Sequence, residues 1–316
     1  MEAKALFHVL NWAVQLQMPI TRVETDALRV SSTLIVDAFT KAWEKSCSTR
    51  GTVVLIVPRN RIYHVNPIKF GGPCEFDHLV FDIHGAIVAS NDGLDYGNYG
   101  NRWLNFENVH NLIVQGGGIV DGYANEWWRC KLQHCSQAPT GLSFHNCENL
   151  TVRDISVRNV QKNHISFTHC KNVKASYLSV TSLQKSNTTN GIYISHTEDI
   201  EIFNSAIRTV GGYCISIESG TKTLRVTDII CGPSYGISIG NLGSGNSKAN
   251  VTDVIINRAK LFGTKYGLKI KTIKGGSGSA SNIKFQNIEM NYVQNPIVIE
   301  QSYCDQNDKL CKLEQV

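Results

Sequence analysis

The sequence predicts an all-β protein, a right-handed parallel β-helix with a short N-terminal capping helix. Its first basis is a set of apolar–x–apolar triplets, each after a turn, at Leu142–Phe144, Ile165–Phe167, Ile192–Ile194, Ile215–Ile217, Ile237–Ile239, Leu268–Ile270 and Ile297–Ile299. Neighbouring triplets begin between 22 residues (Ile215 to Ile237) and 31 residues (Ile237 to Leu268) apart. A repeat of this length with several short strands and no helix between them indicates a β-solenoid.

A second short strand recurs between the triplets and is the second basis of the prediction. It is found at Leu150–Val152, Val173–Ala175, Ile200–Ile202, Leu224–Val226 and Ile283–Phe285. Asn149, Asn172 and Asn282 stand directly before three of these strands, as expected of stacked turns. Leucine-rich repeats are excluded by the leucine spacing, and propeller blades would need about 40 residues and four strands each.

The composition is the third basis, because 26 glycines, 7 prolines and 3 methionines favour strands and tight turns over helices. The one convincing amphipathic helix covers Ser31–Lys45, where it would cap one end of the solenoid. Thr52–Pro58 and Leu79–Val88 are predicted as buried strands. Residues 1–316 are interpreted as a single domain.

Composition and charge narrow the classes of partner. Apolar residues make up 42% and charged residues 18% of the chain, which is typical of a globular protein and excludes a membrane-spanning one. The net charge of +5 fits a polyanionic ligand, and it equally fits a slightly basic protein with no such ligand. No nucleic-acid partner, metal or cofactor is predicted, since Gly116–Gly118 lies in a turn without a following helix and no Cys/His set has zinc spacing.

Ten cysteines favour a secreted protein with disulfide bonds. Three sequons, at Asn149, Asn187 and Asn250, agree weakly with that location. The apolar stretch Ala5–Leu16 is interrupted by polar residues and lacks a basic leader, so it does not read as a signal peptide. Both a secreted and an intracellular location stay open.

Several longer motifs resemble those of plant polygalacturonases, which are pectin hydrolases of glycoside hydrolase family 28. The resemblance runs from about Phe7 to the end of the chain and rests on Gly116–Gly122 with Trp127 and Trp128, Cys214–Ile217, Cys231–Pro233, Gly236–Gly240, Gly275–Asn282 and Asn295–Cys304. It implies the parallel β-helix already predicted and a place in the cell wall. It also implies the disulfides Cys47–Cys74, Cys214–Cys231, Cys304–Cys311 and Cys130–Cys135, with Cys147 and Cys170 left as buried thiols.

The resemblance further implies three catalytic aspartates, contributed by neighbouring repeats, that hydrolyse α-1,4-galacturonan with inversion. At the matching positions this chain has Asn190 in Thr188–Asn190, Tyr213 in Gly211–Tyr213 and, in place of a histidine, Tyr235. Lys269–Lys271 replaces the Arg-Ile-Lys that binds the substrate carboxylate, which keeps the charge but loses the planar guanidinium fork. Lys265 and Lys274 add positive charge nearby; the alternative is that all four lysines lie on a solvated surface.

The missing aspartates lead to a primary hypothesis and two alternatives. The primary hypothesis is a binding or regulatory pseudoenzyme that holds an oligogalacturonide or another small molecule through Asn190, Tyr193, Tyr266 and Lys271. The first alternative is a new acid/base enzyme of isomerase, lyase or cyclase type that uses Tyr213, Tyr235, His164 and Lys269, with a tyrosine pKa lowered by the lysines. The second is residual pectin hydrolysis.

The C-terminal end forms the last expectation. The resembling enzymes continue with further turns after the segment that matches Tyr303–Cys304, whereas this chain has only Asp305–Val316. An uncapped solenoid end exposes strand edges and core residues. A homodimer through this end is therefore predicted as one way to cover it.

Overall fold

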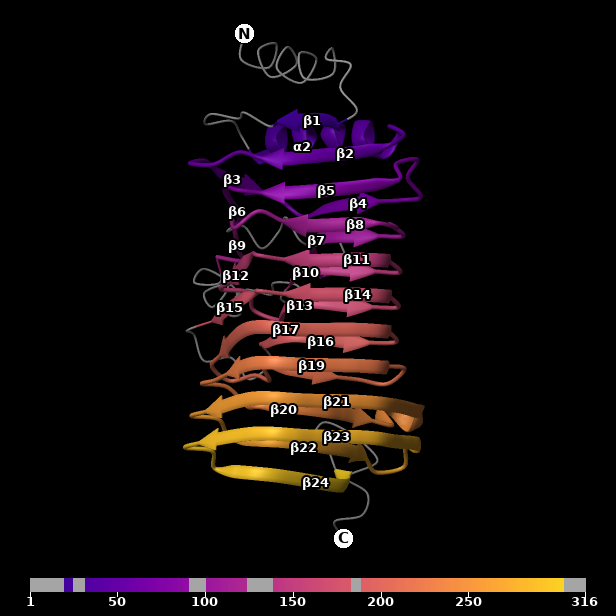
Figure 1. Cartoon of the computed structure of the whole chain (residues 1–316), viewed down its shortest axis with the longest axis vertical. Helices are drawn as coiled ribbons and strands as arrows, with labels where there is room; N and C mark the ends of the chain where they lie inside the picture. The colour runs from indigo at the N-terminus through magenta and orange to yellow at the C-terminus, as the bar shows by residue number, and fades with distance from the viewer. Residues whose placement is uncertain (1–19, 25–31, 91–100, 124–138, 183–188, 304–316) are drawn as a thin grey trace, which may run out of the picture.

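In the computed structural model, residues 20–24, 32–90, 101–123, 139–182 and 189–303 are described. Their backbone winds into coils that stack along one long axis, with the helix at one end and the last strand at the other (Figure 1). The strands of each sheet run parallel to their neighbours, and the prediction of an all-β parallel β-helix is confirmed.

One face of the stack is a nine-stranded sheet, to which each coil adds one strand. In sheet order from the N-terminal end, its strands are β4 (Ile68–Gly71), β7 (Arg102–Glu107), β10 (Thr140–His145), β13 (Asn163–Thr168), β16 (Asn190–Ser195), β18 (Ile215–Ile217), β20 (Ile237–Leu242), β22 (Tyr266–Ile273) and β24 (Asn295–Tyr303). This sheet carries the predicted triplets and nearly all of the predicted site residues.

The remaining strands form a fifteen-stranded sheet of two columns. One column holds β1 (Ile20–Glu24), β2 (Thr52–Val57), β5 (His78–Ile83), β8 (Leu112–Gln115), β11 (Glu148–Arg153) and β14 (Lys171–Ser176). The other holds β3 (Ile62–Val65), β6 (Ala86–Ala89), β9 (Ile119–Asp121), β12 (Ser156–Arg158) and β15 (Ser179–Ser182). Longer strands then continue both columns: β17 (Glu198–Thr209), β19 (Lys222–Cys231), β21 (Lys248–Phe262) and β23 (Ser277–Asn291).

The core consists of like side chains stacked from coil to coil. Leu142 pairs in register with Ile165, and the same position continues through Ile192, Ile215, Ile237 and Leu268. Two positions further along each strand, Phe144 stacks between Phe106 and Phe167 with ring centroids 5.3 and 5.4 Å apart. All of these residues lie in the interior, where burial of apolar surface supplies the main stabilising free energy.

Stacked asparagines hold the turns, as predicted. Asn111, Asn149 and Asn172 have φ between 52 and 56°, which is the left-handed conformation that asparagine tolerates better than most residues. The Asn149 side-chain amide donates to Asn111 (2.9 Å), and that of Asn172 donates to Asn149 (2.7 Å). Each turn therefore repeats the backbone conformation of the one before it.

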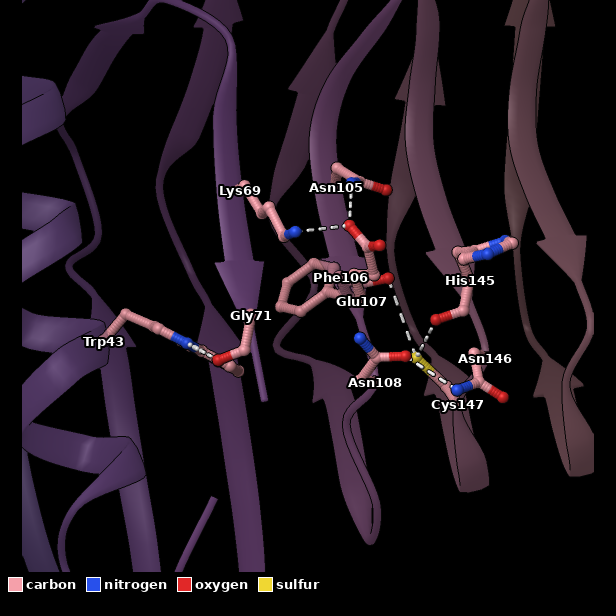
Figure 2. Close-up of polar contacts among 10 residues, drawn as sticks. All are labelled: Trp43, Lys69, Gly71, Asn105, Phe106, Glu107, Asn108, His145, Asn146 and Cys147. Carbon is pink, nitrogen blue, oxygen red and sulfur yellow. Dashed lines mark hydrogen bonds and ion pairs between the residues drawn. The ribbon is translucent and has the colours of Figure 1, made fainter. Parts of the chain in front are cut away.

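Helix α2 (Ser32–Cys47) covers the N-terminal end of the core, close to the predicted bounds. Its Trp43 ring lies 5.1 Å from Phe70 and donates its indole N–H to the Gly71 carbonyl at 2.9 Å (Figure 2). The disulfide Cys47–Cys74, with Cα atoms 4.5 Å apart, ties the end of the helix to the segment after β4. In the described part of the chain, no helix has the length and apolarity needed to cross a membrane.

The other cysteines follow the predicted pattern where the structure describes them. Cys214 and Cys231 form a disulfide across 17 residues, while Cys147 and Cys170 are buried free thiols. The predicted pairs Cys130–Cys135 and Cys304–Cys311 lie outside the described residues.

The C-terminal end of the described stack exposes apolar side chains. Ile297 and Ile299 of β24 are 70% and 71% exposed, although the same positions are buried in β20 (Ile237 and Ile239). Among the described strands, β24 pairs with β22 alone and β23 with β21 alone. The last described strands therefore leave part of their apolar surface exposed.

The aromatic stack predicts a large effect of one core substitution. Phe144→Ala removes a fully buried ring between two others, so we expect the free energy of unfolding to fall by about 3–5 kcal/mol. Chemical denaturation followed by circular dichroism measures this change. Tyr292→Ala, at a side chain that is 93% exposed, is the matched control and should have little effect. Equal destabilisation by both variants would contradict the stacking account.

Candidate functional site

The C-terminal half of the nine-stranded sheet gathers most of the predicted site residues on one face. Strand register places Tyr213, Tyr235 and Tyr266 at equivalent positions, two residues before the buried triplet of each coil. The rings of Tyr213 and Tyr235 meet edge to face with centroids 6.0 Å apart, and those of Tyr235 and Tyr266 at 6.5 Å. The three tyrosines thus form an aromatic row that runs across the strands.

Two lysines of β22 lie beside this row and are nearly inaccessible to solvent. Lys269 is 5% and Lys271 8% exposed. The Lys269 ammonium lies 4.4 Å from the Tyr266 ring centroid and 2.8 Å from a carboxylate oxygen of Glu300, and that of Lys271 lies 3.9 Å from the Tyr303 ring centroid. The alternative of purely solvated lysines is therefore wrong for these two, because a buried ammonium needs a partner in place of water.

Lys265 and Lys274 differ from the buried pair, since both are exposed. The Lys265 ammonium lies 5.3 Å from the ring centroids of both Tyr235 and Tyr266. Lys265 therefore adds a second cation beside the tyrosine row, on its solvent-exposed side.

Burial favours the neutral form of Tyr213 and Tyr193. Burial raises the pKa of Tyr213 to about 12, helped by Tyr266, Tyr303 and Glu300 and opposed by a hydrogen bond with Ser238. Burial also raises the pKa of Tyr193, and the charge of Glu218 adds to that shift. The predicted lowering of a tyrosine pKa by the lysines is thus not found at Tyr213, whose phenol is suited to hydrogen bonding and stacking rather than to proton abstraction.

Asn190 connects two neighbouring coils. Its side-chain NH₂ donates to Asn163 at 3.1 Å, and its side-chain oxygen accepts the backbone N–H of Tyr213 at 3.1 Å. The amide therefore positions Tyr213 at the place where the resembling enzymes carry an aspartate.

His164 faces the interior and lies apart from the tyrosines and lysines. It is fully buried, and the backbone N–H of Val160 donates to its Nε2 at 3.4 Å. Carbonyl oxygens lie close to both ring nitrogens: that of Asn190 is 2.9 Å from Nδ1, and that of Thr181 is 3.2 Å from Nε2. Burial lowers the pKa of His164 to about 4, although the carbonyls of Asn190 and Thr181 act against that shift. This histidine links backbone segments of adjacent coils.

A carboxyl group that the sequence analysis did not select lies on the same face. Glu218 directly follows β18, and Ser216 donates its hydroxyl to a Glu218 carboxylate oxygen at 3.0 Å. Burial raises the pKa of Glu218, while Ser216, Lys271 and the backbone of Asn241 act in the opposite direction. Period-two alternation from Ser216 to Glu218 was the available signal, because both side chains must leave the strand on the face opposite Ile217.

A polar cavity of about 310 Å³ lies next to these residues, toward the C-terminal ends of β22 and β24. Its lining includes Thr272 and Gln301, the residues that follow Lys271 and Glu300. The glycine-rich turn Lys274–Ser277 completes one side. Within the described residues, no group of three or more His, Cys, Asp or Glu side chains is placed to hold a metal ion.

Comparison with known proteins gives consistent results. The family model described as glycosyl hydrolases family 28 matches residues 47–315. The polygalacturonase of Malus domestica is 47% identical over 284 residues, which cover 88% of this chain and 61% of that protein. The polygalacturonase of Persea americana is 47% identical over 277 residues, covering 86% of this chain and 59% of that protein. This chain thus spans about three fifths of the length of these relatives.

A solved structure extends the similarity to the fold. The endo-xylogalacturonan hydrolase from Aspergillus tubingensis superposes with a TM-score of 0.80 at 22% identity, over 92% of this chain and 80% of that one. Similarity at this identity concerns the fold alone, and it agrees with the stacked parallel coils in Figure 1.

These comparisons overturn the hypothesis of a pseudoenzyme and, with it, the alternative of a new acid/base reaction. The relatives at 47% identity carry the name polygalacturonase. Carboxyl groups also lie outside the three motif positions. The structure places Glu218 and Glu300 on the same sheet face, beside Lys271 and Lys269 respectively.

The buried imidazole of His164 predicts a specific loss of stability in acid. Between pH 6.5 and about 4 the unfolded chain takes up a proton that native His164 does not, so stability is full above pH 6.5 and falls toward pH 4. We expect a loss of about 3 kcal/mol across this window that His164→Gln lacks. Urea unfolding at several pH values measures it. His78→Gln, at an exposed histidine, should keep the wild-type dependence, and identical pH slopes for wild type and His164→Gln would contradict this assignment.

Proposed function

This chain belongs to glycosyl hydrolases family 28, and on that premise we propose that it hydrolyses galacturonan, the acidic polysaccharide of pectin. The observation that carries the proposal is 47% identity to polygalacturonases over more than four fifths of the chain. The sheet face that carries the tyrosine row and the buried lysines is the proposed binding surface.

The chemistry of this face suits an acidic sugar. Lys269 and Lys271 are buried cations beside aromatic rings, and their positive charges attract an incoming uronate carboxylate. Tyr213, Tyr235 and Tyr266 present ring surfaces on which sugar rings pack, and hydroxyl groups that bond to sugar oxygens. Asn190 and Tyr193 belong to the same proposed surface through their places in β16.

Hydrolysis of a glycosidic bond needs a proton donor, and we assign that role to Glu218. The three motif positions of the resembling enzymes offer no carboxyl group here, whereas burial keeps Glu218 protonated to a higher pH than an ordinary glutamate. The Glu300 carboxylate lies 2.8 Å from the Lys269 ammonium, and it is the candidate to activate water.

Further features of the proposal concern location and assembly. Two disulfides support an extracellular, cell-wall setting of the kind that a pectin hydrolase needs. The single-domain organisation of residues 1–316 and the homodimer through the C-terminal end stay predictions.

The first experiment is a long incubation of the purified protein with oligogalacturonides, followed by mass spectrometry. We expect shorter fragments whose summed mass exceeds that of the starting oligomer by one water. Unsaturated fragments would mean elimination and would reject hydrolysis. Unchanged oligomers after prolonged incubation would also reject the proposal.

The role of Glu218 is tested by a single substitution. Glu218→Gln keeps the size of the side chain but removes the proton donor, so kcat should fall by about 10²–10⁴-fold. Wild-type activity should decline as pH rises through the Glu218 pKa, because only the protonated acid donates. Glu201→Gln, at an exposed glutamate of β17, is the matched control and should leave kcat unchanged. Wild-type kcat in Glu218→Gln would remove Glu218 from the mechanism.

A further inference from the structure

Three histidines at one corner of the stack lie on neighbouring coils with their rings close together. His145 is the last residue of β10, while His169 and His196 directly follow β13 and β16. The ring centroids of His145 and His169 are 5.1 Å apart, and those of His169 and His196 are 4.7 Å apart. Because one full coil separates them in the sequence, their spacing matches no metal-binding motif, and only the stacking brings them together.

His169 and His196 are equivalent residues of successive coils, and both are accessible to solvent. Each has a left-handed backbone, with φ of 57° and 48°, so the two side chains leave their turns in the same direction. The backbone N–H of His169 donates to the Ser195 carbonyl at 3.1 Å, which joins the two turns. The two rings lie within 6° of parallel, and both residues are exposed. An ion in solution can therefore reach both imidazoles.

The imidazole of His196 is held in place by the residues around it. Its Nδ1 lies 2.8 Å from the Ser195 hydroxyl oxygen, and that hydroxyl can donate its own proton to the Ser219 carbonyl at 3.4 Å. The ring also packs on Gly220, where a Cβ atom would lie 2.5 Å from the His196 Cδ2. With the ring proton on Nδ1, the Nε2 atom keeps a lone pair for a ligand. Histidines that bind metals are typically oriented by such a hydrogen bond at their second nitrogen.

The imidazole of His169 can turn toward that of His196. No hydrogen bond to a described residue holds the His169 ring. Two nitrogens that bind one metal ion at about 2.1 Å each lie about 3 Å apart. Rotation of the His169 ring about its side-chain bonds brings a nitrogen into this range, because the ring centroids are only 4.7 Å apart. Without a metal the rings stack in parallel, and the described residues contain no preformed cluster of three ligands.

His145 is not part of the pair, because positive charges lie near it. Burial lowers the pKa of His145, and the charges of Arg102 and Lys69 add to that shift. The Glu107 carboxylate offsets only one of these charges, since it forms an ion pair with Lys69 at 2.8 Å (Figure 2). The remaining positive charge repels a metal cation. No described lysine or arginine contributes to the pKa of His196, which is lowered mainly by burial.

We propose that His169 and His196 together bind one divalent transition-metal ion, with Cu²⁺ bound most tightly. Imidazole nitrogens are ligands for copper, zinc and nickel, and affinity among these divalent ions is highest for Cu²⁺. Nε2 of His196 and a ring nitrogen of His169 supply two ligands, and water completes the coordination. The ion joins two neighbouring coils at the ends of β13 and β16. The site lies at the turns rather than on the face of the sheet, so the inference does not depend on the proposed hydrolase activity.

The test is a titration of the untagged, metal-free protein with Cu²⁺, followed by calorimetry and by electron paramagnetic resonance. We expect one tightly bound Cu²⁺ per chain, with a spectrum that shows coordination by two imidazole nitrogens. Zn²⁺ should compete for the site, whereas excess Mg²⁺ should not, since Mg²⁺ prefers oxygen ligands. Competition by Mg²⁺ would reject the two histidines as the ligands.

His169→Asn and His196→Asn each remove one ligand. Asparagine is chosen because it readily adopts the left-handed backbone of both positions, so the melting temperature should change little. We expect each variant to lose the bound Cu²⁺ at concentrations that saturate the wild type. Ser195→Ala should keep both ligands and weaken binding about 10-fold, because the Nδ1 of His196 loses its partner.

His145→Gln and His78→Gln are the matched controls. His145 belongs to the same row of rings, whereas His78 is an exposed histidine of the other sheet. Both variants should bind Cu²⁺ as the wild type does. The proposal is overturned if the wild type lacks the spectrum of two imidazole nitrogens, if either asparagine variant binds Cu²⁺ as tightly as the wild type, or if His145→Gln loses the ion. The spectrum of the wild type decides the question even if an asparagine variant does not fold.

Discussion

Every feature of this protein depends on the in-register stacking of one coil on the next. Because neighbouring strands are parallel and paired residue by residue, a side chain at one position is placed about 4.8 Å from its equivalents above and below. The stacked rings of Phe106, Phe144 and Phe167 fill the interior by this rule. On the opposite face the same rule aligns Tyr213, Tyr235 and Tyr266 into a row. The same strand register therefore aligns the side chains of the core and those of the candidate site.

The sequence was sufficient to predict the fold because the constraint is local and repeated. Each apolar triplet carries the same period-two pattern. A strand that is ambiguous in one coil can therefore be predicted from the equivalent strand of the next coil. The positions of α2, the disulfides Cys47–Cys74 and Cys214–Cys231 and the asparagine ladders were predicted on the same grounds or from the resemblance. The direction of each side chain within the site was harder to predict from the sequence, because it depends on contacts between neighbouring coils.

Three site residues show where sequence reasoning stopped. His164 sits at a strand start like the site residues, but its ring points inward, one position before the triplet, to backbone carbonyls that the sequence does not place. Lys269 looks like a surface lysine in the sequence, and only the stacking of β22 between β20 and β24 buries it. Glu218 lies outside the positions that match a known motif, although alternation along the strand places it on the same face as Ser216.

The pairing of β24 on one edge only affects how readily this strand detaches from its sheet. A strand with neighbours on both edges leaves a sheet only by breaking two ladders, whereas β24 has only the one to β22 among the described strands. Its exposed Ile297 and Ile299 add little burial to resist detachment. Local opening, of the kind that amide hydrogen exchange detects, is therefore less costly at this strand than at strands paired on both edges. Since β24 carries Glu300 and Tyr303, each such opening uncovers the ammonium groups of Lys269 and Lys271.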